Sequence, residues 1–159
     1  MTGVLATITR RPVTDTDLPL LRALYAETRT EELALVPWTE PAKTAFLASQ
    51  FDLQHRHYHE TMPDGEFWLL EQGDIPVGRL YLHERRNELG LVEIALRASE
   101  RGHGIGTALI RETQARATAQ GLPVRLYVEQ FNRARFLYER LGFTYCGEQG
   151  PYFHMEWVP

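Results

Sequence analysis

Three glycines alternate at positions 102, 104 and 106, within the stretch ASERGHGIGTAL that spans residues 98–109. The stretch lies between a run typical of a β-strand and a run typical of a helix. A helix N-terminus presents amide hydrogens without intrahelical partners and the positive end of the helix dipole, which together suit an anion. Glycine lacks a Cβ, so a phosphate can approach the backbone closely, and Arg101 adds a positive charge. The spacing therefore predicts a binding site for a pyrophosphate.

Other glycine-rich sites fit this stretch less well. A P-loop requires a lysine after its last glycine, and the stretch contains no lysine. The dinucleotide motif G-x-G-x-x-G requires a third glycine where Thr107 or Leu109 stands, although Glu129 ends the next predicted strand at a suitable distance. A plain turn needs one or two glycines rather than three beside an arginine. The dinucleotide site and the plain turn are kept as alternatives.

Hydrophobic periodicity and turn residues predict the elements that position this stretch. Thr39 and Asn132 are suitable helix caps, and Gly142 follows the last helix. We expect strands at residues 5–13, 66–73, 74–84, 88–98, 123–129, 144–148 and 152–157, and helices within the segments 14–33, 39–62, 105–121 and 132–143. Short connections favour antiparallel neighbours. The order indicates an α/β protein of the α+β type, with a mixed, mostly antiparallel sheet of about seven strands and about four helices.

The composition is that of a folded protein. Hydrophobic residues make up 43% of the 159 residues and charged residues 24%, so we expect a single domain over residues 1–159. The net charge of −4 argues against a nucleic-acid partner. No apolar run is long enough for a membrane span, and the N-terminus does not resemble a signal peptide. We therefore expect a cytoplasmic protein without disulfides, with its one cysteine, Cys146, buried in a strand.

Two segments resemble the GNAT N-acyltransferase superfamily. The run RGHGIG at residues 101–106 matches that family's R/Q-x-x-G-x-G/A signature. Downstream, NRARFLYERLGF at residues 132–143 resembles the segment that closes the family's cofactor site. The preceding strand also agrees, so the resemblance covers residues 89–143, about a third of the chain. It implies a GNAT-like fold and an acyl-CoA-dependent N-acyltransferase.

The resemblance implies that acetyl-CoA is the co-substrate. Its pyrophosphate would lie on the backbone amides of residues 101–107, and its pantetheine arm would pair with a strand as an added edge strand does. The Leu96 amide would then stabilise the oxyanion of the thioester carbonyl. His103 either contacts a CoA phosphate or, as we favour, is a solvated loop histidine. The cofactor-binding residues implied are Ile94, Ala95, Leu96, Arg101, Gly102, His103, Gly104, Ile105, Gly106, Thr107 and Asn132.

Two residues are candidates for proton transfer in a direct attack of an amine on the thioester. Tyr138 would protonate the departing thiolate, the alternative being an ordinary core tyrosine. Glu93 lies in the otherwise apolar strand LVEIAL, where alternation places it opposite Val92, Ile94 and Leu96. A half-buried carboxylate there would have a raised pKa and could act as the base, the alternative being a solvated or ion-paired group.

The sequence gives less evidence about the amine acceptor than about the co-substrate. Gln54, His55 and Tyr58 lie beside an apolar helix position and are expected to line the acceptor pocket. His55 and His59 share a helix face, but no third ligand is apparent, so we expect no metal. The acceptor is a small-molecule or peptide amine, a membrane partner is not expected, and a homodimer is possible. The alternative function is a non-catalytic acyl-CoA-binding or regulatory module of the same fold.

Overall fold

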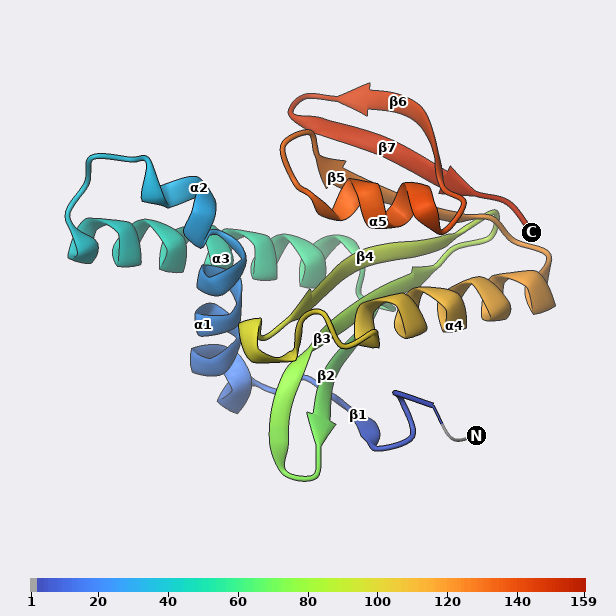
Figure 1. The fold of residues 1–159 in the computed structure, drawn as a ribbon, viewed down its shortest axis with the longest axis horizontal. Helices are drawn as coiled ribbons and strands as arrows, with labels where there is room; N and C mark the ends of the chain where they lie inside the picture. Colours follow the sequence, from blue (N-terminus) through green and yellow to red (C-terminus); the bar gives the residue numbers. More distant parts are fainter. Residues whose placement is uncertain (1–2) are drawn as a thin grey trace.

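The computed structural model describes residues 3–159, and its strands form one sheet in the order β1-β2-β3-β4-β5-β7-β6 (Figure 1). The strands are β1 (Ile8–Pro12), β2 (Glu66–Gln72), β3 (Ile75–Glu84), β4 (Leu89–Leu96), β5 (Val124–Glu129), β6 (Thr144–Gln149) and β7 (Tyr152–Trp157). Neighbouring strands are antiparallel except β4 and β5, which are parallel. The predicted seven-stranded, mostly antiparallel mixed sheet is therefore confirmed.

The helices follow the predicted order. They are α1 (Leu18–Thr28), α2 (Thr30–Ala34), α3 (Glu40–Thr61), α4 (Ile105–Gln120) and α5 (Ala134–Arg140), with 3-10 turns η1 (Asp15–Asp17) and η2 (Ala98–Glu100). The expected first helix is interrupted at Arg29, so α2 is a separate short helix. None of the helices within residues 3–159 combines the length and the apolar character that a bilayer crossing requires.

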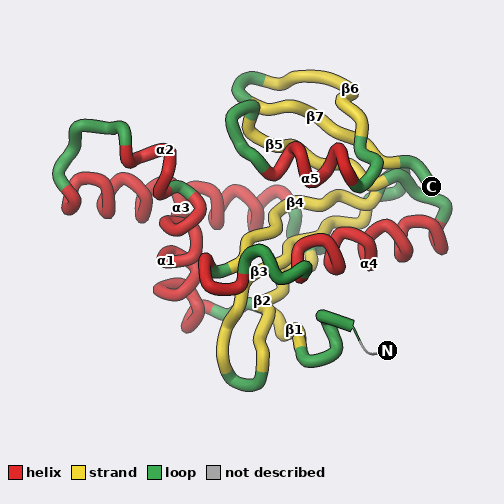
Figure 2. Tube along the Cα trace, viewed as in Figure 1, coloured by secondary structure: helices red, strands yellow, loops and turns green. Residues whose placement is uncertain are grey.

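Helices cover both faces of the sheet. Leu69 and Leu70 on β2 point to opposite faces, and both are fully buried. Leu69 packs with Leu21 of α1 and Phe51 of α3, whereas Leu70 belongs to a larger cluster that includes Leu109 of α4. Figure 2 shows α1, α2 and α3 gathered together, away from α4. The sheet is thus the middle layer, with α1 and α3 on one face and α4 and α5 on the other.

The sheet splits between β4 and β5. These strands pair at only two positions, Leu89 with Val124 and Gly90 with Arg125. Beyond these pairs they diverge (Figure 1), while β5 stays paired with β7 along its whole length. The split leaves one edge of β4 without a neighbouring strand, in the middle of the protein rather than at its surface.

The edge strand β6 corrects one expectation. Cys146 lies in β6 but is exposed, not buried. Every residue of β6 is exposed, because the strand ends the sheet. The Cys146 thiol donates a hydrogen bond to the His154 carbonyl of β7, at 3.4 Å from Sγ to oxygen.

Candidate active site

The β4 edge that faces the split presents backbone groups of Ile94 and Leu96 that no strand pairs with, although the Leu96 carbonyl accepts from Arg101. The Ala95 carbonyl points to β3, where a Cβ on Gly78 would come within 2.3 Å of its oxygen. The Arg97 amide also bonds to β3, at 2.9 Å from the Val77 oxygen. Backbone groups of successive strand residues point to opposite edges, so those of Ile94 and Leu96 point into the split. An extended ligand could pair with these two residues, whereas Ala95, expected to share in that pairing, is directed to β3.

A β-bulge at Val92 sets the direction of Glu93. Tyr81 of β3 pairs with Glu93 and Leu82 pairs with Leu91, so Val92 has no counterpart. Strict alternation would place Glu93 on the same face as Leu91, which packs in the core against α4. The bulge turns Glu93 to the opposite face, toward α3, and bulges commonly re-aim side chains in this way beside active sites.

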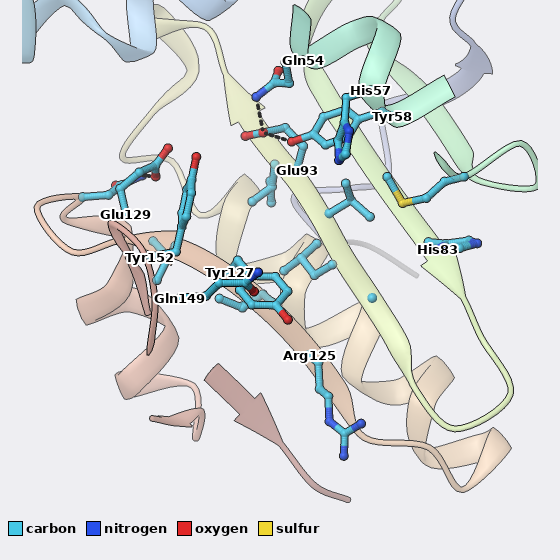
Figure 3. Close-up of a pocket in the computed structure, with 18 of the residues that line it drawn as sticks. Gln54, His57, Tyr58, His83, Glu93, Arg125, Tyr127, Glu129, Gln149 and Tyr152 are labelled. Carbon is cyan, nitrogen blue, oxygen red and sulfur yellow. Dashed lines mark hydrogen bonds between the residues drawn. The ribbon is translucent and has the colours of Figure 1, made fainter. Parts of the chain in front are cut away.

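The Glu93 carboxylate is held by donors from α3 (Figure 3) and lies near a cation from β3. The Tyr58 hydroxyl donates to Oε2 at 3.2 Å, the Gln54 amide lies at 3.5 Å, and the Arg79 guanidinium lies at 3.9 Å. The side chain is 26% exposed, so it still reaches the adjoining cleft. Burial raises the pKa of Glu93 above its ordinary value, and the Arg79 charge opposes that rise. A carboxylate with a raised pKa can accept a proton nearer neutral pH.

Arg79 is a site residue that the sequence reasoning missed. It lies on β3, is 1% exposed, and donates to the Gln54 oxygen at 3.1 Å. Its guanidinium packs over the rings of Tyr81 and Phe51, at 4.9 Å and 5.7 Å from their centroids. Arg79 thus holds Gln54 in place and supplies positive charge beneath Glu93. The signal for it was an arginine inside the apolar run VGRLYL, because a charge is almost never fully buried unless it is paired.

A cleft of about 820 Å³ opens at the split. It is lined by residues from α3, β4, β5, α5 and the β6–β7 turn, and Gln54, Tyr58, Glu93 and Tyr138 are among them. The structure therefore brings both predicted proton-transfer residues to one cavity. Burial, and then the charges of Glu93 and Glu129, raise the pKa of the Tyr138 hydroxyl, which stays protonated and able to donate.

The predicted anion site is a loop that leads directly into α4. Gly102 and Gly104 have φ angles of +78° and +85°, which side-chain-bearing residues rarely adopt. The first backbone bond of α4 runs from the Ala108 amide to the Gly104 oxygen, at 3.0 Å. The amides of residues 105–107 therefore have no acceptor within the helix, and no side chain caps it. Such free amides at a helix N-terminus are suited to a phosphate.

Three further predicted residues lie around the split. The Arg101 guanidinium donates to the Leu96 oxygen at 3.1 Å, which ties the glycine loop to the open edge of β4. His103 is exposed on that loop. Asn132 lines the cleft and accepts from the Ala134 amide at 2.9 Å. It thus caps α5, although the structure assigns the N-cap position to the next residue, Arg133.

Two histidines of α3, His55 and His59, do not line the cleft, whereas His57 does (Figure 3). His55 is not among the residues lining the cleft, and its ring stacks on Phe51 with centroids 5.6 Å apart. His59 packs against it, with the ring centroids at 4.4 Å. Within residues 3–159 no group of three or more histidine, cysteine or acidic side chains is arranged to hold a metal ion.

Comparison with known proteins decides the family. A sequence model described as the acetyltransferase (GNAT) family matches residues 22–143. The chain belongs to the GNAT acetyltransferase family. This match extends upstream through α1 and α3, the helices in which no family signature was recognised from the sequence. No curated protein matches this GNAT chain.

Solved structures share the GNAT fold of this chain. The PaiA N-acetyltransferase of Thermoplasma acidophilum, solved with coenzyme A, superposes with a TM-score of 0.71 at 22% identity, covering 96% of this chain and 99% of its own. An acetyltransferase of Thermus thermophilus gives a TM-score of 0.67 at 24% identity, covering 96% of each chain. Naa50 of Arabidopsis thaliana, solved with the bisubstrate analogue CoA-Ac-MVNAL, gives 0.60 at 18% identity, covering 95% of this chain and 97% of its own. At these identities the likeness concerns the fold.

Proposed function

We propose that this GNAT protein is an N-acetyltransferase that transfers an acetyl group from acetyl-CoA directly to a primary amine, with both substrates bound together. The observation that carries the proposal is that Glu93 and Tyr138 line one cleft, beside the open edge of β4. Glu93 can accept a proton from the amine, and Tyr138 can donate a proton to the departing thiolate. Acyl transfer to an amine requires both proton transfers.

The residues around the split fit acetyl-CoA. The free amides of residues 105–107 would hold the pyrophosphate, and the backbone groups of Ile94 and Leu96 would pair with the pantetheine arm. When bound, acetyl-CoA supplies an acetyl group activated as a thioester. The Thermoplasma acidophilum relative was solved with coenzyme A, which supports this co-substrate.

The chain's own groups account for the protons. Glu93 takes a proton from the ammonium, directly or through water, so that a neutral amine can attack. The Leu96 amide donates to the carbonyl oxygen. After the C–N bond has formed, Tyr138 gives its proton to the sulfur as the C–S bond breaks, and the proton that the new amide nitrogen loses restores the Tyr138 hydroxyl. The sum is one ammonium and one thioester giving one amide, one thiol and one proton, and the exposed Cys146 of β6 does not line the cleft to act as a relay.

A thiol-release assay with a panel of primary amines tests the proposal. We expect release of free CoA that requires both an amine and acetyl-CoA. A protein whose melting temperature rises with acetyl-CoA but which releases no thiol with any amine is a binding module of the same fold, and that result would contradict the proposal.

Replacing Gly104 with alanine is expected to weaken acetyl-CoA binding about tenfold, measured as KM or by calorimetry, since the strained turn misplaces amides that bind a charged group. Gly121→Ala is the matched control. Gly121 has φ +68° at the other end of α4, and a Cβ at either glycine meets nothing within 4 Å. Both variants should lose about 1–2 kcal/mol of stability, but only the first should change acetyl-CoA binding. Equal KM values in the two variants would refute the anion site.

A further inference from the structure

The acceptor side of the cleft carries two carboxylates on one face of the sheet. Glu93 faces α3 from β4, as the bulge directs. On β5, Leu126 and Val128 pack in the core against α4 and α5, so Glu129 lies on the opposite face, the one that Glu93 shares. Both carboxylates line the cleft, from the two strands that flank the split. In Figure 3 the Tyr152 ring lies between them.

The two carboxylates differ in how they are compensated. Glu93 has the Arg79 guanidinium beneath it, at 3.9 Å. Glu129 accepts a hydrogen bond from the neutral Asn132 amide at 3.1 Å and forms no ion pair within residues 3–159. Burial and the charge of Glu129 raise the pKa of the neighbouring Tyr152, consistent with a negative potential there. A cation brought to Glu129 would therefore meet an unpaired carboxylate beside aromatic rings, which also attract cations.

The two arginines that line the cleft, Arg85 and Arg125, lie toward its closed end. Arg125 lies at the last β4–β5 pair and binds Glu156 at 2.7 Å and Glu88 at 3.5 Å. Arg85, in the β3–β4 turn, donates to His83 at 3.2 Å. Arg125 is thus held by two carboxylates, and both arginines lie toward the end of the cleft where β4 and β5 pair, away from Glu93 and Glu129.

We propose that the acceptor is a dicationic amine without a carboxylate, whose reacting amine lies at Glu93 and whose second positive group is bound by Glu129. This inference rests on the proposed acetyl transfer and names its substrate class. It disfavours ω-amino carboxylates, because their far carboxylate would face Glu129, itself a carboxylate. The alkyl chain between the two amines would lie against the Tyr152 and Tyr58 rings, which line the same cleft.

Matched acceptors of three to six carbons test the inference in the wild-type protein, by thiol release with saturating acetyl-CoA. At each length an alkylamine, an α,ω-diamine and an ω-amino carboxylate differ only in the far group. We expect the best diamine to exceed the alkylamine of its length in kcat/KM by about tenfold to a hundredfold, and the amino carboxylate to be the poorest. Equal kcat/KM values for the diamine and the alkylamine, or a higher kcat/KM for the amino carboxylate, would overturn this inference while leaving the proposed acetyl transfer intact. No thiol release with any amine would overturn both proposals.

The variant Glu129→Gln tests whether Glu129 causes the preference for a diamine over an alkylamine. The ratio of diamine to alkylamine kcat/KM should fall toward one, mainly through KM for the diamine. Asp74→Asn removes the same charge from the β2–β3 turn, far from the cleft, and should keep the wild-type ratio. A ratio that falls equally in both variants would show a general charge effect and would contradict the assignment to Glu129.

Discussion

Replacing Glu93 with glutamine is expected to lower kcat by about 100-fold or more, because a positioned general base contributes about 10²–10⁴-fold. Glutamine keeps the shape of the side chain and can still accept from Tyr58, so the fold should be preserved. The variant removes the carboxylate that α3 holds in the cleft and that we assign to take the proton of an ammonium. Steady-state kinetics with saturating acetyl-CoA measure the effect.

The pH dependence separates a base from a merely structural carboxylate. The pKa of Glu93 is raised above its ordinary 4.5, so kcat/KM of the wild type should fall as the pH falls through that raised value. Glu93→Gln should lose this limb of the profile. The folded state also holds the Glu93 proton more tightly than the unfolded state does. Its contribution to stability therefore declines as the pH rises from 4.5 through the raised pKa, and the variant should not show that decline. A variant with wild-type kcat and an unchanged profile would remove Glu93 from the mechanism.

Replacing Tyr138 with phenylalanine is expected to lower kcat about 100-fold while leaving acetyl-CoA binding within about twofold. The change removes one oxygen from a side chain that is 7% exposed, so the packing against Phe143 is kept. The fall in kcat should depend on the pKa of the departing thiol, because Tyr138 donates its proton to the sulfur. A thioester analogue with a more acidic thiol should therefore restore part of the rate.

Tyr145→Phe is the control for this loss. Tyr145 is exposed on β6 and does not line the cleft, so its variant should retain the wild-type rate. If Tyr138→Phe also kept the wild-type rate, Tyr138 would be a core tyrosine and another group would protonate the thiolate.

Local patterns were sufficient to predict the elements. Alternating apolar residues, glycine turns and caps such as Thr39, whose hydroxyl accepts from the Ala42 amide at 3.3 Å, act over a few residues and can be read directly. The interruption at Arg29 and the exposure of Cys146 could not be read in this way. The exposure of Cys146 depends on which strand ends the sheet, which is a tertiary feature.

The sequence indicates the candidate site residues that belong to a motif. It does not indicate those whose position depends on pairing between strands. The glycine loop and the Tyr138 helix can be recognised by their spacing. The bulge at Val92 cannot, because it exists only in the register between β3 and β4. Arg79 gains its role from Gln54 and Glu93, which are distant in the sequence, and Glu129 gains its role from the split between β4 and β5. Arg79 is buried next to Glu93, whereas Glu129 faces the cleft and forms no ion pair with any residue from 3 to 159.

The most direct test follows a labelled acetyl group. Acetyl-CoA carrying ¹³C in the acetyl group is incubated with a primary amine and the protein, and the products are measured by mass spectrometry. We predict labelled N-acetyl amine and free CoA in a one-to-one ratio with the wild type, and a rate reduced about 100-fold with Glu93→Gln. Tight binding of acetyl-CoA without any labelled amide would contradict the account and leave this GNAT fold as a binding module.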